Sequence, residues 1–208
     1  MRKLSFCLLS AVVFFSTPSR ADTLAPDYQG RGHITDIGGG IKELGLSTTF
    51  VAHYSQDYGV ESSNAMFVIL PTFRLFLATN FPLEINFGFF YRSSNLTVAH
   101  QKGMMGGVAL SYYISLGSGF FLAPRVGFSG FYGWHDVPIG NGVYQSNTVA
   151  GMAPSAGLGL AFYPHRSLSL RAGPLVTAFW GKEKDPAGNP QTLTTIDGGL
   201  DFAIHYVF

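Results

Sequence analysis

Seven ionisable residues could act together if the chain folds into alternating strands. A carboxylate beside a histidine is a potential general acid–base pair, whereas opposite charges in a narrow interior are usually paired with one another. If residues 78–80 form a turn, Arg74 faces Glu84 directly across a hairpin. We therefore predict a structural salt-bridge network, with a polar conduit and a catalytic carboxylate–histidine pair as alternatives. The seven are Arg74, Glu84, Arg92, Arg125, Arg171, Asp201 and His205.

Hydrolytic chemistry has one further candidate, the H-x-S pair His53 and Ser55. A histidine close to a serine could serve as the base that activates a nucleophile. However, His53 has the inward parity of its stretch, and the sequence supplies no convincing acidic partner. Glycine-rich phosphate loops, zinc-ligand spacings and nucleophile elbows are missing from the sequence. We predict no catalytic residues, no metal site and no cofactor.

The elements that must position these residues alternate between large apolar and polar or small side chains. Leu83, Ile85 and Phe87 share one face, while Glu84 and Asn86 share the other, which is the two-residue period of a β-strand. Most of the stretches reach about 10 residues, close to the roughly 9–11 that cross a bilayer at a tilt. Eight such stretches cover residues 43–54, 65–77, 81–92, 107–116, 120–134, 148–164, 168–180 and 193–208.

The connections between these stretches alternate in length. Tight turns are expected at 78–80, 117–119 and 165–167, and Asn80 and Gly119 suit the left-handed position of a three-residue hairpin loop. Longer polar segments separate the other pairs, at 55–64, 93–106, 135–147 and 181–192. Short turns at one end and long loops at the other are typical of transmembrane β-barrels. With an even number of strands, both ends of the barrel domain lie on the short-turn side.

Aromatic residues gather at the two ends of the predicted strands. Phe81, Phe120, Phe162 and Phe208 have outward parity at the short-turn ends. A second outward set stands at the long-loop ends, and two such girdles are expected where a lipid-facing wall meets each interface. The members of this second set are Tyr54, Tyr91, Tyr132, Trp134 and Trp180.

The first 21 residues have the form of a cleaved signal peptide, with a basic start, an apolar core and small residues at Ser19 and Ala21. Cleavage would remove the single cysteine, Cys7, and three of the 13 basic residues, leaving 10 against 12 acidic ones. This balance gives no electrostatic reason to expect nucleic acid as a partner. Residues 22–42 are predicted to form a flexible periplasmic segment, and residues 43–208 the barrel.

The ending "GGLDFAIHYVF" carries a resemblance to a known family. Together with the eight stretches and the signal peptide, it resembles the small eight-stranded outer-membrane β-barrels of OmpA- and OmpX-like type. The resemblance implies an all-β fold, a closed antiparallel up-and-down eight-stranded barrel in the bacterial outer membrane. It also implies that outer-membrane lipid and lipopolysaccharide surround the wall. Phe208 and Tyr206 match the pattern that the barrel assembly machinery recognises in that family.

The resemblance leaves the function less defined than the fold. We expect a non-enzymatic protein that supports the envelope or contacts a host or environmental ligand through four outer loops. The alternative is a lipid A-modifying hydrolase, since some small barrels of this kind deacylate lipid A with a histidine and a serine, as in His53 and Ser55. A third possibility is a pore for small solutes, which a filled lumen would disfavour.

Four prolines do not fit the expected barrel. Pro71, Pro124, Pro154 and Pro174 all fall inside predicted strands. Proline cannot donate a hydrogen bond to a ladder, and a closed barrel has no edge strand to accommodate it. β-bulges are one solution that the sequence alone does not establish.

Overall fold

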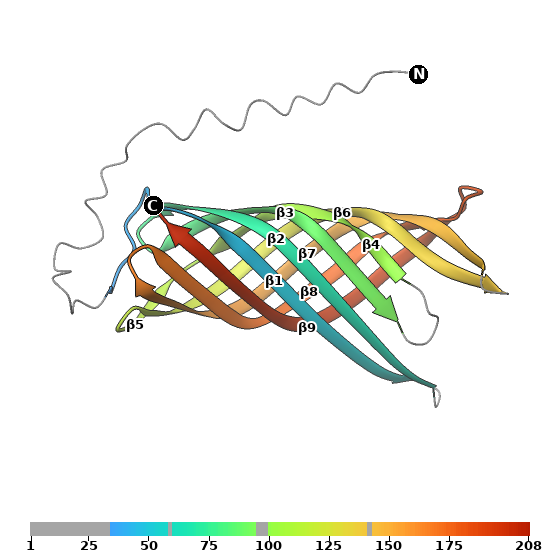
Figure 1. The fold of residues 1–208 in the computed structure, drawn as a ribbon, viewed down its shortest axis with the longest axis horizontal. Helices are drawn as coiled ribbons and strands as arrows, with labels where there is room; N and C mark the ends of the chain where they lie inside the picture. Colours follow the sequence, from blue (N-terminus) through green and yellow to red (C-terminus); the bar gives the residue numbers. More distant parts are fainter. Residues whose placement is uncertain (1–33, 58–59, 95–99, 141–142) are drawn as a thin grey trace, which may run out of the picture.

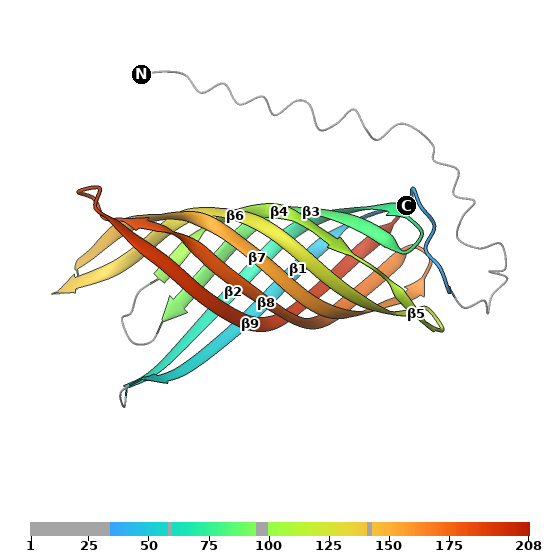
Figure 2. The same cartoon turned by 180° about the vertical axis from the view of Figure 1, so that it is seen from behind.

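One closed antiparallel sheet contains nearly all of the ordered secondary structure (Figures 1 and 2). The computed structural model describes residues 34–57, 60–94, 100–140 and 143–208, of which 52–57, 60–64, 94 and 140 are described by their backbone alone. The sheet order is β4-β3-β2-β1-β9-β8-β7-β6-β5, and pairing of β4 with β6 closes the ring. The strands are β1 (Lys42–Asp57), β2 (Val60–Ala78), β3 (Phe81–Ser94), β4 (His100–Ser111), β5 (Ile114–Gly117), β6 (Phe120–Gly140), β7 (Val143–His165), β8 (Leu168–Lys184) and β9 (Pro190–Val207).

β4 and β5 are two parts of one barrel strand. Both pair with β6 in a continuous register, with Ser111 opposite Arg125 and Ile114 opposite Leu122. Between them, the Tyr112 amide still donates to the Pro124 carbonyl at 3.1 Å. The ring therefore has eight positions, and the predicted closed up-and-down barrel of eight antiparallel strands is confirmed. In the described part of the chain, no helix is long and apolar enough to cross a membrane.

The strand prolines are accommodated by local gaps in single ladders. A missing N–H removes hydrogen bonds toward one neighbouring strand only, and the ladder toward the other neighbour continues. The register is the same on both sides of each gap, so the four prolines at 71, 124, 154 and 174 require no bulge. The β2–β3 ladder lacks pairs at 70–71, the β7–β8 ladder lacks them at 153–154 and 173–174, and the break between β4 and β5 faces Pro124.

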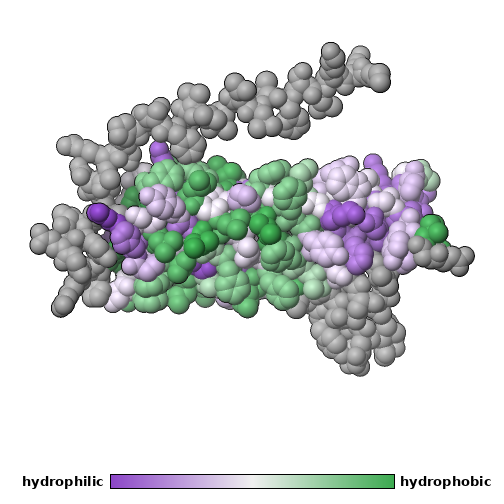
Figure 3. Space-filling model, viewed as in Figure 1, coloured by the Kyte–Doolittle hydropathy of each residue, from purple (hydrophilic) through white to green (hydrophobic). Residues whose placement is uncertain are grey.

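The wall separates an apolar outside from a mixed inside. In β9, Leu200, Phe202 and Ile204 are exposed, whereas the intervening Asp201 and Ala203 are buried. Figure 3 shows the apolar colour as a continuous band over the wall, with hydrophilic residues gathered on the strand ends opposite the C-terminus. Leaving so much apolar surface in water would be unfavourable. The band therefore identifies a lipid-facing surface.

The strands extend farther than the sequence pattern indicated, and the prediction of four long loops was wrong in this respect. Residues 135–140 continue β6, residues 143–147 begin β7, and residues 181–184 continue β8. Beyond the lipid, both faces of a hairpin meet water, so the alternation of apolar and polar residues that marks a membrane strand is lost while backbone pairing continues. The polar segments are mostly strand extensions rather than loops.

The tight turns follow the expected backbone chemistry. Asn80 adopts a left-handed conformation with φ of 62°, and Gly119 one with φ of 78°. Asn80 also binds the segment before β1, because its Oδ1 accepts from the Ile37 amide at 2.8 Å and its Nδ2 donates to Asp36 Oδ1 at 2.9 Å. Ile37 is fully buried. The greater part of the predicted flexible segment 22–42 lies outside the described residues, but residues 34–41 lie against the barrel end.

Two apolar clusters fill the lumen at different heights. The first, the mid-lumen cluster, is formed by Val51, Met66, Val68, Leu70, Phe90, Met105, Phe131, Ala153 and Phe179. The second, the end cluster, closes the short-turn end and is formed by Ile37, Phe76, Tyr113, Phe121, Ala123, Ala161, Tyr163 and Val207. Between them lies the polar layer described next.

Candidate functional site

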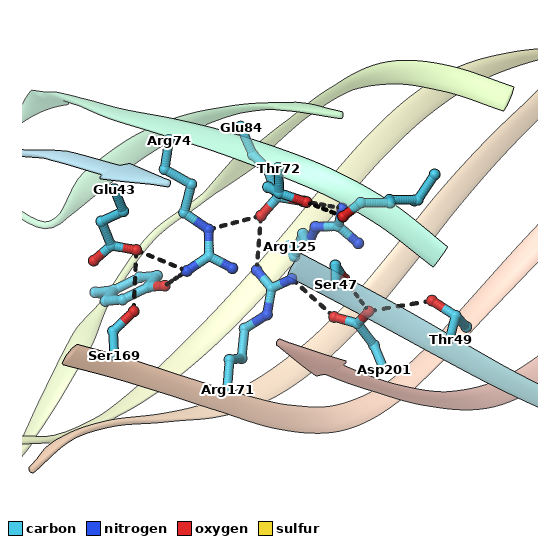
Figure 4. Close-up of polar contacts among 12 residues, drawn as sticks. Glu43, Ser47, Thr49, Thr72, Arg74, Glu84, Arg125, Ser169, Arg171 and Asp201 are labelled. Atoms are coloured by element: carbon cyan, nitrogen blue, oxygen red, sulfur yellow. Dashed lines mark hydrogen bonds and ion pairs between the residues drawn. The ribbon is translucent and has the colours of Figure 1, made fainter. Parts of the chain in front are cut away.

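The polar layer of the lumen is organised around Glu84. Its Oε2 atom accepts from Arg74 Nε at 2.8 Å and from Arg171 Nη1 at 3.0 Å, and its Oε1 atom accepts from Arg125 Nη2. Arg74 is the register partner of Glu84 across the β2–β3 hairpin. The two other arginines come from β6, which is separated from β3 by one barrel strand, and from β8, which lies across the ring, so the carboxylate connects distant parts of the wall (Figure 4).

Two further carboxylates complete the layer. Glu43 accepts from Arg74 Nη1 at 3.0 Å, from Tyr163 at 2.6 Å and from Ser169 at 3.1 Å. Asp201 accepts from Arg171 Nη2 at 2.8 Å, and the hydroxyls of Ser47 and Thr49 donate to its other oxygen (Figure 4). Each carboxylate thus has several donors, as a buried charge requires.

The layer contains equal numbers of opposite charges. The guanidinium groups of three arginines face the carboxylates of Glu43, Glu84 and Asp201, and none of these six side chains is more than 9% exposed. Charges of one sign only would repel one another in this poorly solvated space. With the balance shown, the layer can remain ionised and fill the lumen without attracting an ion of either sign.

Two residues of the predicted set make no hydrogen bond to this layer among the described residues, although one of them, His205, is the register partner of Ser169. Arg92 pairs with Asp197 at 3.2 Å and contacts Thr195 at 3.4 Å. His205 is buried on β9, and neither of its ring nitrogens has a hydrogen-bond partner among the described residues. Five of the seven predicted residues are therefore joined by ion pairs, and in the described part of the chain no carboxylate is hydrogen-bonded to His205.

Sequence reasoning missed several members of the lumen. Glu43 was placed at the start of a strand but not recognised as an Arg74 partner, and Asp197, Tyr113 and Tyr163 were not considered. The alternation of the strands could have placed these residues on the inward face. Their contacts could not be predicted from the sequence, because partners such as Glu43 and Tyr163 are 120 positions apart.

A small cavity separates the polar layer from the mid-lumen cluster. Its volume is about 40 Å³, and hydroxyl and amide groups of Ser47, Asn86 and Ser155 line it beside apolar residues. A water needs roughly 10–15 Å³ of such volume, so the cavity has room for a few water molecules only. The mid-lumen cluster on one side of the cavity and the end cluster at the short turns close the lumen.

The long-strand end carries a second group of polar contacts. His135 Nδ1 lies 2.9 Å from Glu183 Oε1, and Asn147 Nδ2 donates to the same oxygen at 2.6 Å. The backbone at His53 and Ser55 belongs to β1, but the side chains of this predicted pair lie outside the described residues. In the described part of the chain, no group of three His, Cys, Asp or Glu side chains could hold a metal ion.

The predicted outer girdle residues face outward where their side chains are described. Tyr91, Tyr132, Trp134 and Trp180 are all exposed, and the rings of Tyr132 and Trp134 meet edge to face at 5.8 Å. The Tyr54 side chain is not among the described ones. At the other end, Tyr206 stacks on Phe208 with ring centroids 6.3 Å apart.

A closed eight-stranded ring, an apolar outer wall and a lumen filled by side chains define a class of protein. The chain is an integral β-barrel of the bacterial outer-membrane type.

Comparison with known proteins supports this class. The chain is similar to Neisserial surface protein A, with a TM-score of 0.51 and 13% identity over 85% of this chain and 99% of that one. It is also similar to the outer membrane protein OprG from Pseudomonas aeruginosa, with a TM-score of 0.52 and 14% identity over 82% of this chain and 96% of that one.

A third match is weaker. The translocator domain of autotransporter NalP from Neisseria meningitidis gives a TM-score of 0.46 at 12% identity, and the match covers 82% of this chain but only 63% of that domain. No protein-family model matches the sequence. No curated protein matches it either. At these identities the likeness concerns the fold alone.

Proposed function

We propose that the protein is a non-enzymatic outer-membrane barrel that contacts a host or environmental ligand through its outer hairpins, within a membrane of lipid and lipopolysaccharide. The observation that carries this proposal is the closed lumen. A charge-balanced layer lies between two apolar clusters, so transport through the centre has no continuous polar path. Specific contacts are then left to the segments beyond the lipid.

The β6–β7 hairpin is the best candidate for such contacts. Beyond Asp136 and Thr148 its two strands pair only with each other, so the hairpin projects past its neighbours. It carries Ile139, Val143 and Tyr144, which are 61%, 54% and 48% exposed. Exposed tyrosine and isoleucine side chains are suitable anchors for a protein contact. Because the hairpin is not basic, binding should depend weakly on salt.

The test is to shorten this hairpin. Residues 137–147 would be replaced by a two-residue turn, and the matched control would shorten the β8–β9 loop at 185–189, which carries no large exposed apolar residue. Cells bearing each variant would be compared for adhesion to epithelial monolayers and for resistance to detergent. We expect the first variant alone to lose adhesion while its barrel stays heat-modifiable and folded. Full adhesion by the first variant would contradict the proposal.

A lipid A-modifying hydrolase is the second candidate, favoured by the His135–Glu183 contact. A carboxylate bonded to Nδ1 orients an imidazole so that Nε2 can act as a base. Against this reading, no serine or threonine hydroxyl contacts His135 among the described side chains. Mass spectrometry of lipid A from cells with the wild-type protein, with His135→Ala and without the protein would distinguish the two candidates. We expect identical spectra.

A solute pore is the third candidate, and the filled lumen argues against it. Purified protein in planar bilayers should give no stable conductance steps. Reproducible steps that disappear in a variant with a bulkier mid-lumen cluster, such as Ala153→Leu, would favour the pore instead.

A further inference from the structure

Residues 34–41 lie over the short-turn end of the barrel, and we call this segment the lid. Figure 1 shows it in blue beside the C-terminus. The Ile37 amide donates to Asn80 Oδ1 at 2.8 Å, and the Ile37 carbonyl accepts from the Asn80 amide at 2.9 Å. Closer to β1, the lid exchanges two backbone hydrogen bonds with Phe76, at 2.7 and 2.9 Å. These hydrogen bonds all go to β2 and to the turn that follows it.

The side chain of Ile37 completes the apolar cluster that closes this end. Ile37 is fully buried, and among the described members of the end cluster it alone does not belong to the barrel wall. Ile34 and Ile41 pack against the same cluster. Burial of these isoleucines stabilises the closed position of the lid. Withdrawal of the lid would leave a gap in the cluster.

A run of glycines joins the lid to β1. Gly38, Gly39 and Gly40 are consecutive, and Gly40 adopts a left-handed conformation with φ of 87°. Glycine adopts such a conformation without a steric cost, and a Cβ at Gly40 would meet nothing within 4 Å. Rotation of the backbone at this run can therefore swing residues 34–37 away while β1 stays paired with β2.

Two polar side chains beneath the end cluster lack hydrogen-bond partners. His205 and Arg74 occupy the inward positions next to Val207 and Phe76, which are members of that cluster. Both polar residues are 1% exposed, yet among the described residues neither ring nitrogen of His205 has a partner, nor does Arg74 Nη2. A buried polar atom without a partner retains its desolvation cost. Water that entered from the short-turn end would remove this cost.

We propose that residues 34–41 are a hinged lid that opens and closes on the folded barrel and controls the access of water to His205 and Arg74. Burial of Ile37 and the hydrogen bonds to Asn80 favour the closed lid, and the unpartnered polar atoms beneath it oppose closure. A segment held by few contacts and opposed in this way opens locally, without unfolding of the barrel. The mid-lumen cluster stays in place, so an open lid hydrates one end of the lumen without creating a pore.

Chemical modification of His205 tests the lid. Diethyl pyrocarbonate acylates an imidazole nitrogen that solvent can reach, and mass spectrometry locates the product. A disulfide between Gly39→Cys and Ala78→Cys would lock the lid, since a Cβ at Gly39 would lie 3.5 Å from the Ala78 Cα. The full chain would also carry Cys7→Ser, which removes its single native cysteine. The oxidised and the reduced forms of this one protein then compare a locked and a free lid.

We expect formation of the disulfide to slow the modification of His205 severalfold. His165, which is exposed at the end of β7, is the internal reference and should react equally in both forms. Heat-modifiability would show that the barrel is folded in each. Modification of His205 at one rate in both forms, or none in either, would overturn the lid.

A second pair of variants tests the contact that holds the lid. Asn80→Gly keeps the left-handed turn but removes the side-chain bonds to Ile37 and Asp36, so it should speed the modification of His205 severalfold. Ser118→Gly is the matched control, because it makes the same kind of change at another left-handed position, with φ of 55°, and should leave the rate unchanged. Equal rates in the two variants would overturn the assignment of Asn80 as the residue that holds the lid closed.

Discussion

In the part of the barrel toward the short turns, ion pairs join side chains that are at most 9% exposed, such as Arg125 and Glu84. In the outer extensions, the Lys102–Asp136 pair joins side chains that are 57% and 22% exposed. Both pairs have short contacts, yet the physical meaning differs. A buried charge that loses its partner keeps a desolvation cost, whereas an exposed one regains water. The comparison predicts that removing one partner of an ion pair is strongly destabilising in the buried region and nearly neutral in the outer extensions.

Removing Glu84 should have the largest effect. Glu84→Ala would leave three guanidinium groups without their shared carboxylate, and breaking one buried pair already costs about 3–5 kcal/mol. We expect at least this loss in the free energy of unfolding, measured by urea titration in lipid vesicles. Glu183→Ala, in the outer region, is the matched control and should cost far less. Equal losses for the two variants would remove the distinction between the regions.

A double-mutant cycle sharpens this result. Arg74→Ala should also be strongly destabilising, and combining it with Glu84→Ala should recover part of the loss because neither charge is then left without the other. Coupling between contacting residues is typically about 0.5–3 kcal/mol. Strictly additive losses would show that Arg74 and Glu84 do not interact.

The adjacent glycines 198 and 199 compare the two faces of one strand, because Gly198 has the outward parity of Leu200 and Gly199 the inward parity of Asp201. A Cβ at Gly199 would collide with the Phe50 carbonyl oxygen, whereas a Cβ at Gly198 meets nothing within 4 Å. Overpacking typically costs about 1–3 kcal/mol, so Gly199→Ala should lower the free energy of unfolding by this amount and Gly198→Ala should leave it nearly unchanged. Similar losses in both variants would contradict this difference between the two faces.

The exposed pair should contribute little. Lys102→Ala removes the 3.0 Å contact with Asp136, and exposed ion pairs are worth about 0–1 kcal/mol. We expect the same urea midpoint as the wild type within that range, and no change in heat-modifiability. A loss of several kcal/mol would place Lys102 in a network that the contacts do not reveal.

The smallest expected effect is on pH dependence. A hydrogen bond from Ser146, and then one from Lys102, lowers the pKa of the Asp136 carboxyl below its ordinary value. A lowered folded-state pKa means that the contribution is present above the ordinary pKa and is lost as the pH falls through the lowered one. The stability difference between wild type and Ser146→Ala should therefore be greatest at neutral pH and vanish in acid. A difference that grows on acidification would contradict this sign.

The closed ring of strands could be predicted from the sequence, but the contacts between side chains inside it could not. Alternation in the segment that contains Leu83 and Glu84 identifies a strand and its two faces, and the turn at residues 78–80 determines which residue of β2 faces Glu84. The convergence of Arg125 and Arg171 on the same carboxylate depends on how the strands are staggered around the closed ring. That stagger is a property of the whole sheet and not of any one segment.

The outer strand ends were unpredictable for a different reason. Residues 137–147 do not alternate between apolar and polar side chains, because water lies on both faces of that hairpin. The polar sequence therefore predicted a loop where the structure has paired strands. For the prolines, the sequence predicted an irregularity that the structure does not have. Their positions inside strands seemed to require bulges, but single-ladder gaps at Pro71, Pro154 and Pro174 accommodate them without any shift in register.

The burial of Ile37 has a consequence for the order of assembly. Its surroundings are built by Phe76 of β2, Tyr113 between β4 and β5, Phe121 of β6, Tyr163 of β7 and Val207 of β9. Because these residues come from around the whole ring, the pocket for Ile37 cannot exist until the last strand has joined the first. Residues 34–41 therefore dock only after the barrel has closed. In a refolding time course, protection of this segment from protease would date the moment at which the barrel closes.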